Sequence, residues 1–213
     1  MVVGHFAAAM VAKRFEPGIS LGTAALAAML ADFVAFVLLI AGVERFTPST
    51  FIPYSHSLAT LAIWGAAFAG LYFLRRRSAR AAWILFALVM SHWVLDAISH
   101  PRYVPDMALV PGAGPLVGLG LWGSLPATLA VEGGFWIVAL TAYVRATRGS
   151  TWAGRYVFWM VAALLTLIWV GNIRRGVDPN PVRAGIGGLM VFGLMVGWTY
   201  WMNRARPVDV PSH

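Results

Sequence analysis

Ionisable side chains recur inside or at the ends of strongly apolar segments of this chain. The histidines among them are His5, His56, His92 and His100, and the acidic residues are Asp32, Asp96 and Glu132. An ionisable group in the hydrocarbon region costs roughly 2.5 kcal/mol or more, so it is seldom kept without a partner. Neutral imidazole and carboxylate are also common ligands of zinc-like divalent ions. The simplest explanation of the set is a metal site between membrane helices.

The spacing of three of these residues is typical of one helix face. His92, Asp96 and His100 follow one another at intervals of four residues, so they fall within an arc of about 80° on a helix. A His–Asp pair at this spacing can hold one ion, as pairs of histidines do in zinc enzymes. His100 stands roughly 12 Å along the helix axis from His92, too far to share that ion. It could line the mouth of the site, act there as acid or base, serve a second ion, or cap the helix before Pro101.

Each residue also has a structural explanation. A single buried histidine can be a hydrogen-bonded packing residue, Asp32 could pair with a histidine, and Glu132 could be protonated against a backbone carbonyl. The combination of three histidines and two aspartates makes this explanation less favoured than a metal site. Neighbouring hydroxyls could orient the imidazoles, although a serine at a helix start is also a common cap. The serines considered for this role, or for lining the mouth, are Ser55, Ser57, Ser91 and Ser99.

The elements that must position these groups are membrane helices. The chain is 60% hydrophobic and 11% charged, with a mean hydropathy of +0.74, which departs from soluble domains. A helix needs about 20 apolar residues to cross a bilayer. The predicted spans are 18–42, 56–74, 80–100, 124–144, 156–172 and 184–202, while 2–12 suffices only for partial or tilted insertion. We therefore expect an all-α integral membrane protein, a polytopic bundle of six or seven transmembrane helices forming one domain over residues 1–213.

The charge distribution predicts partners and orientation. The net charge is +8, but the arginines lie in short loops beside apolar spans. The positive-inside rule and anionic headgroups account for them there, so we expect membrane lipids and no nucleic acid as partners. The basic loop at residues 75–80 is placed in the cytoplasm, which puts loops 43–55 and 101–123 outside. One loop does not follow the positive-inside rule, because its basic residues Arg174, Arg175 and Arg183 would also lie outside.

This orientation brings the ionisable residues of five segments to one depth, in the outer half of the membrane. No cleavable signal peptide is evident, and we expect a multi-pass protein of the inner (cytoplasmic) membrane. The chain has no cysteine, which excludes disulfides and thiolate ligands and leaves nitrogen and oxygen to bind a metal.

The segment 101–123 is rich in proline and glycine and still apolar. Non-helical backbone at membrane depth is tolerated where it is buried in protein or lines a cavity. We interpret the segment as a lid or re-entrant loop over the site, with an ordinary interfacial loop as the alternative. Residues 124–213 are interpreted as supporting helices. Within them, the glycine-rich stretch 185–197 predicts close helix packing, either inside the chain or in a homo-oligomer or membrane complex.

Four short stretches in the first 105 residues carry a resemblance to a known family. They are GH at 4–5, LAD at 30–32, YSHSL at 54–58 and SHWVLDAIS at 91–99. Their order is similar to the pattern GH…PDxD…HRGxTHS…SHxxxDxxT of the inner-membrane, metal-dependent hydrolase family of bacteria and archaea. The resemblance implies metal-binding roles for His5, Asp32, His56, His92 and Asp96.

Other positions of that pattern are matched loosely or not at all. Ser99 falls at the threonine of the pattern. The second aspartate falls at Val34, and a histidine and an arginine fall at Phe51 and Ile52. A site for two ions would thus be reduced to one ion, or to an inactive relic.

The function expected from the resemblance is hydrolysis. A lid beside a metal site in the outer leaflet would suit an amphipathic or lipid-like substrate near the extracytoplasmic leaflet. A bound zinc-like ion would lower the pKa of its water towards ~7, with Asp96 or Glu132 as general base. Three alternatives remain open: an accessory subunit of a membrane complex, a transporter of protons or metal ions, and a b-type haem carrier. Haem would not explain Asp32 and Asp96. No duplicated halves support a repeat-built transporter.

Overall fold

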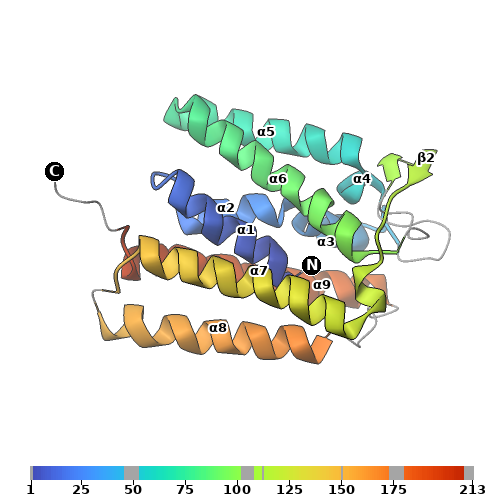
Figure 1. Cartoon of the computed structure of the whole chain (residues 1–213). Helices are drawn as coiled ribbons and strands as arrows, with labels where there is room; N and C mark the ends of the chain where they lie inside the picture. The colour runs from blue at the N-terminus through green and yellow to red at the C-terminus, as the bar shows by residue number, and fades with distance from the viewer. Residues whose placement is uncertain are drawn as a thin grey trace.

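The fold is a bundle of helices, seen in a computed structural model that describes residues 2–45, 53–101, 108–111, 113–149, 151–172 and 180–208. Helices α1 to α6 are Val2–Phe15, Leu21–Ala28, Leu30–Ile40, Pro53–His56, Leu58–Arg76 and Ala79–Ser99. Helices α7 to α9 are Leu125–Ala146, Trp152–Asn172 and Pro181–Ala205. A two-stranded hairpin, β1 (Ala108–Val110) and β2 (Ala113–Leu116), and the 3-10 turn η2 (Leu121–Gly123) separate α6 from α7. The predicted all-α class is confirmed (Figure 1).

The structure has five or six helical segments that could span a membrane, and six is the lower of the two predicted numbers. Among the described residues, the five helices α5 to α9 are long and apolar enough to cross a membrane. The pair α2 and α3 provides a sixth span if the two are counted together. Helix α1 has 14 residues, which is too short for a full crossing at about 1.5 Å per residue.

The short helix α1 lies at the centre of the bundle. It contacts α2, α6 and α7, and Figure 1 shows the N-terminus within the outline of the bundle. Val3, Phe6 and Met10 are at most 1% exposed. A helix that is apolar on all sides is buried by its neighbours, and here this burial carries His5 into the interior.

The predicted span 18–42 is not one straight helix. It begins after Ser20, whose side chain accepts a hydrogen bond from the Thr23 amide at 3.0 Å, and it breaks at Met29, where α3 departs by 59° from α2. The last carbonyls of a helix lack helical partners. Here the Ala28 carbonyl accepts a hydrogen bond from His92 Nδ1 at 2.8 Å. The bend places Asp32 in the first turn of α3.

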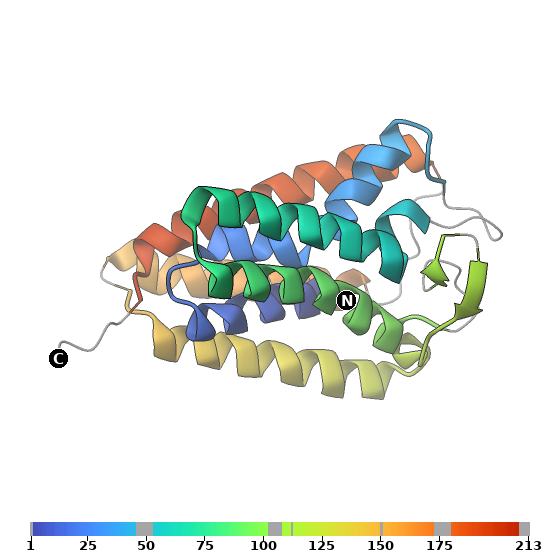
Figure 2. The ribbon, with the colours of Figure 1, turned by 90° about the horizontal axis from the view of Figure 1, so that it is seen from above.

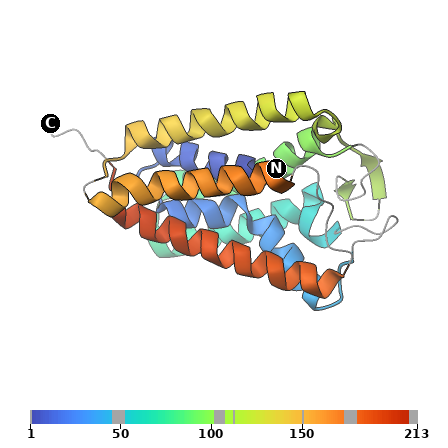
Figure 3. The ribbon, with the colours of Figure 1, turned by 90° about the horizontal axis from the view of Figure 1, so that it is seen from below.

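The two ends of the bundle differ in charge. The turns between α1 and α2, α5 and α6, and α7 and α8 gather at one end with the close of α9, while α4 and the hairpin lie at the other (Figures 1, 2 and 3). At the first end, Arg80 pairs with Glu16 at 3.3 Å and Arg206 donates to the Gly154 carbonyl at 2.8 Å. The loop 75–80, which is predicted to be cytoplasmic, therefore shares its end of the bundle with the turns that follow α1 and α7 and with the end of α9. Arg183 lies at the hairpin end, and positions 174 and 175 lie outside the described residues.

Glycines allow α9 to approach α3. A Cβ on Gly185 would lie 2.9 Å from the Phe36 carbonyl oxygen, and one on Gly188 would overlap the Phe36 ring. Gly187 and Gly193 face open space. Of the two interpretations of the glycine-rich stretch, packing within the chain applies to Gly185 and Gly188.

Candidate metal centre

Five ionisable residues from four helices gather in one cluster. His5 comes from α1, Asp32 from α3, His56 from α4, and His92 and Asp96 from α6. They form two groups of three, in each of which the ligand atoms lie within 4.8 Å of one another. The first group is His5, His92 and Asp96, and the second is Asp32, His56 and His92. His92 belongs to both groups and is the centre of the cluster.

The carboxylates lie between the imidazoles. Asp96 Oδ1 is 3.3 Å from His5 Nε2, and Asp96 Oδ2 is 3.1 Å from His92 Nε2. Asp32 Oδ1 is 3.6 Å from His56 Nε2 and 3.8 Å from His92 Nε2. The His5 and His92 rings stack with centroids 3.8 Å apart, which fixes both planes. Every Nε2 atom therefore faces a carboxylate oxygen.

The cluster is buried and opens at one residue. His5, His92 and Asp96 have side chains at most 5% exposed, and so does His56, whereas the Asp32 side chain is 28% exposed. The Asp32 side chain is therefore the most exposed part of the cluster.

Hydrogen bonding fixes the tautomer of His92. Its Nδ1 lies 2.8 Å from the Ala28 carbonyl oxygen, and because a carbonyl only accepts, we assign the proton to Nδ1. In a neutral ring Nε2 then carries a lone pair, directed at the carboxylates of Asp96 and Asp32. Buried acceptors facing one another require a positive charge between them. A divalent ion, or a second proton on the imidazole, would supply it.

A second network orients His56 and includes a residue that the sequence interpretation missed. Glu44, only 1% exposed, accepts hydrogen bonds from the backbone amides of Tyr54 and Ser55 at 2.8 and 2.9 Å. The Ser55 hydroxyl donates to Glu44 Oε2 at 2.9 Å and lies 2.8 Å from His56 Nδ1. Since the single hydroxyl proton goes to the carboxylate, His56 Nδ1 donates to Ser55 Oγ. This leaves His56 Nε2 as an acceptor facing Asp32.

Burial raises the pKa of the Glu44 carboxyl, while its hydrogen bonds with Ser55 act in the opposite direction. The sequence signal that could have identified this residue is an acidic side chain in the same loop as the YSHSL stretch. Glu44 follows the end of an apolar span, so the survey of spans did not include it.

The remaining predicted serines do not orient imidazoles. Ser91 donates to the Leu88 carbonyl and Ser99 to the Leu95 carbonyl, each at 2.7 Å. A serine within a helix reaches the carbonyl three or four residues earlier, and this local bond takes its proton. Ser57 lies 2.7 Å from the Thr60 hydroxyl. Of the four predicted serines, Ser55 is the one whose hydroxyl contacts a histidine ring.

The described residues of the segment 101–123 include several that contact the end of α6. The amides of Leu119 and Gly120 donate to the carbonyls of Ala97 and His100 at 2.8 and 2.9 Å, and β1 contacts α4 and α5. His100 ends α6, and its ring lies 4.6 Å from the Trp122 ring. Burial lowers the pKa of His100 to about 4, so the ring is neutral at pH 7. The place of His100 at the mouth of the site and the lid both stay predictions.

The two residues predicted to be catalytic lie in different surroundings. Asp96 lies among the candidate ligands. Glu132 on α7 is 1% exposed and is in neither ligand group. Its Oε1 accepts a hydrogen bond from Trp122 Nε1 at 2.6 Å, and its Oε2 has no hydrogen-bond partner in the described part of the chain. Its role as general base stays a prediction.

The positions where the family pattern is not matched fall partly within the described residues. Val34 lies on α3 and is 9% exposed, so a hydrocarbon side chain occupies that position. Positions 51 and 52, which carry Phe51 and Ile52, lie outside the described residues. Comparison of the chain with protein-family models, with curated proteins and with solved structures gave no match.

Proposed function

We propose that this protein is a membrane-embedded, metal-dependent hydrolase whose centre is formed by His5, Asp32, His56, His92 and Asp96. The observation that carries the proposal is the convergence of three imidazoles and two carboxylates in a buried cluster. Two of the imidazoles have Nδ1 engaged in a hydrogen bond and Nε2 directed at a carboxylate. Ligands of protein-bound metals are oriented in this way.

The arrangement favours one ion over two. His92 has a single lone pair for a metal, at Nε2, and both groups of three residues depend on it. The aliphatic Val34, in place of a second carboxylate, agrees with this. A donor set of nitrogen and oxygen with a position left for water suits a zinc-like ion.

In hydrolysis, a bound divalent ion would lower the pKa of a water molecule to about 7 and so provide a nucleophile. The residues of the chain hold the geometry around it. Asp96 keeps His5 and His92 in fixed positions, and Asp32 borders the open side. Asp96 and Glu132 are the candidates to accept a proton, and Glu132 has one carboxylate oxygen without a hydrogen-bond partner among the described residues.

The position of the cluster supports a substrate from the membrane. Helices α3 and α4 and the end of α6, which carry four of the five residues, lie towards the hairpin end, opposite the end where the basic loops gather (Figure 1). The positive-inside rule assigns the basic end to the cytoplasm, which puts the centre near the extracytoplasmic leaflet of the inner membrane. An amphipathic or lipid-like ester or phosphoester is the substrate class that fits this location.

Turnover by the purified protein tests the proposal. We expect hydrolysis of a water-insoluble ester or phosphoester by zinc-loaded protein in detergent, and its loss after chelation and in His92→Ala. His100→Ala, at the end of the same helix but outside both ligand groups, is the matched control for metal binding and should retain the metal. Equal turnover by stripped wild type and His92→Ala would contradict the proposal. A metal-loaded protein that hydrolyses none of these substrates would favour an accessory subunit.

A proton transporter is a second candidate, supported by the arrangement of the polar contacts. A series of polar contacts runs from Glu44 through Ser55, His56 and Asp32 to His92. The first two are hydrogen bonds of 2.9 and 2.8 Å, and the next two are ion-pair distances of 3.6 and 3.8 Å. Such chains conduct protons in membrane proteins. Proton flux into proteoliposomes, abolished by Asp32→Asn in a protein that binds no metal, would favour this function over hydrolysis.

A further inference from the structure

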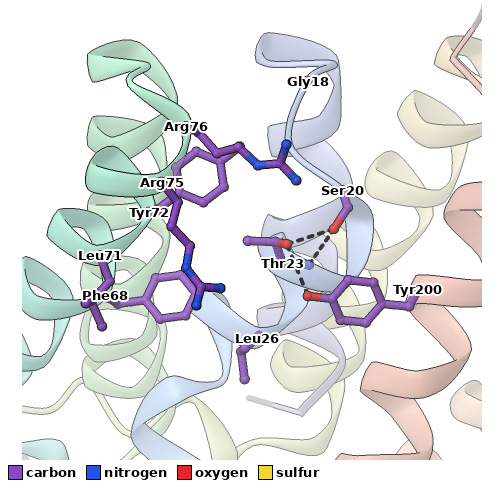
Figure 4. Close-up of a pocket in the computed structure, with 10 residues that line it drawn as sticks. All are labelled: Gly18, Ser20, Thr23, Leu26, Phe68, Leu71, Tyr72, Arg75, Arg76 and Tyr200. Atoms are coloured by element: carbon purple, nitrogen blue, oxygen red, sulfur yellow. Dashed lines mark hydrogen bonds between the residues drawn. The ribbon is translucent and has the colours of Figure 1, made fainter.

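A second site lies at the basic end of the bundle, away from the metal centre. It is a cavity of about 560 Å³ over α2, between α5 and α9 (Figure 4). Along α5, its lining positions are 68, 71, 72, 75 and 76, which is the spacing of one helix face. The residues on this face change from apolar to cationic towards the end of the helix.

Two arginines provide the cationic part. Arg75 and Arg76 extend from α5 towards α2 (Figure 4), and neither makes a hydrogen bond or an ion pair within the described part of the chain. The nearby Arg80 instead pairs with Glu16 at 3.3 Å. No acidic residue lines the cavity among the described residues. The two guanidinium groups thus leave their donors for a ligand.

Three hydroxyls form the opposite wall. Ser20 Oγ lies 2.8 Å from Thr23 Oγ1, which lies 3.2 Å from the Tyr200 hydroxyl. The two contacts use two of the three hydroxyl protons, so one donor remains. Gly22 is required for this wall, because a Cβ there would overlap the Tyr200 ring. Tyr200 can therefore pack on α2 and place its hydroxyl beside Thr23.

The deeper part of the cavity is apolar. Leu26 lies further along α2 than Ser20, and Phe68 and Leu71 precede the arginines on α5. Figure 4 shows these side chains on the side of the cavity away from Gly18. Charged and hydroxylated surface thus borders apolar surface, as the phosphate of a phospholipid borders its acyl chains.

We propose that this cavity binds an anionic phospholipid, with Arg75, Arg76 and the hydroxyl wall on its phosphate and Leu26, Phe68 and Leu71 against the start of its acyl chains. Arginine binds phosphate through several donors in a fixed plane, and hydroxyls complete the coordination. The apolar part distinguishes a lipid from a free phosphate ion. This inference depends on the fold and the cavity, and it does not require the metal centre to be active.

Native mass spectrometry of the detergent-purified protein, titrated with phosphatidylglycerol or phosphatidylcholine, tests the inference. We expect saturable binding of one phosphatidylglycerol with preference over phosphatidylcholine. In Arg75→Gln/Arg76→Gln the affinity should fall roughly tenfold or more, since each basic group contributes about 1 kcal/mol. Thr23→Val, which keeps the shape and removes a hydroxyl, should weaken binding by a smaller factor.

The matched control is Arg14→Gln/Arg77→Gln, which removes two charges from the same end without touching the cavity. It should change the affinity less than twofold, and size-exclusion profiles should show that all variants remain folded. Equal losses in the two double variants would overturn the proposal in favour of a diffuse basic surface. Absence of selectivity, or displacement of the lipid by millimolar inorganic phosphate, would also overturn it, the latter in favour of a phosphate-ion site.

Discussion

His92 Nδ1 lies 2.8 Å from the carbonyl oxygen of Ala28, at the point where α2 ends and the chain bends by 59°. One contact therefore links two features of the site. It provides a partner for a carbonyl at a helix end, and it turns His92 Nε2 towards Asp96 and Asp32. The bend in the second span and the orientation of the central candidate ligand depend on each other.

This contact predicts that the two nitrogens of His92 have separable roles. His92→Ala removes both, so it should abolish metal binding and lower the free energy of unfolding by about 2–4 kcal/mol through a lost hydrogen bond and a cavity. His92→Asn keeps a donor near the position of Nδ1 and should recover part of that stability without recovering metal. Thermal denaturation and metal content of both variants check this. Equal stability of the Ala and Asn variants would show that the Ala28 contact contributes nothing.

The serines on either side of His56 should behave differently. Ser55→Ala removes the acceptor of His56 Nδ1 and the link to Glu44, so metal affinity should fall about tenfold or more. Loss of a hydrogen-bond partner of a metal ligand typically has an effect of this size. Ser57→Ala is the control, because the Ser57 hydroxyl contacts Thr60. Competition with a chromophoric chelator measures both affinities. Equal affinities in the two variants would exclude a positioning role for Ser55.

The sequence predicted the part of the site that depends on local spacing. The His92–Asp96 pair needs only a helix, and the apolar pattern of residues 80–100 indicated one. The bend at Met29 could not be predicted, because neither proline nor glycine marks it and its partner His92 is distant in the sequence. The role of Glu44 depends equally on a contact formed by folding. Ser91 and Ser99 donate to local helix carbonyls, an option that is open to any serine within a helix.

Close packing of α9 on α3 gives a stability prediction. Gly188→Ala should lower the free energy of unfolding by roughly 1–3 kcal/mol, because the added Cβ overlaps the Phe36 ring. Gly187→Ala faces open space and should be neutral or stabilising by up to about 1 kcal/mol, given the higher helix propensity of alanine. Melting temperatures in one detergent compare the two. A Gly188→Ala protein as stable as Gly187→Ala would contradict the described packing.

Substitutions of Glu132 and Trp122 should distinguish a role in proton transfer from a role in supporting the 101–123 segment. Glu132→Gln still accepts the Trp122 hydrogen bond but cannot take up a proton, so hydrolysis should fall roughly 100-fold or more with metal retained. Trp122→Phe keeps the ring against His100 and removes the hydrogen bond, so it should have a much smaller effect. Turnover at saturating metal measures both. Full activity of Glu132→Gln would leave Asp96 as the candidate base.

The metal content of the purified protein tests the central claim most directly. Inductively coupled plasma mass spectrometry should find one divalent ion per chain in wild type and in His100→Ala, and almost none in His92→Ala and Asp96→Ala. The variants should remain folded by size exclusion. A wild-type protein that stays metal-free after incubation with zinc would contradict the account, and so would a His92→Ala protein that still binds one ion.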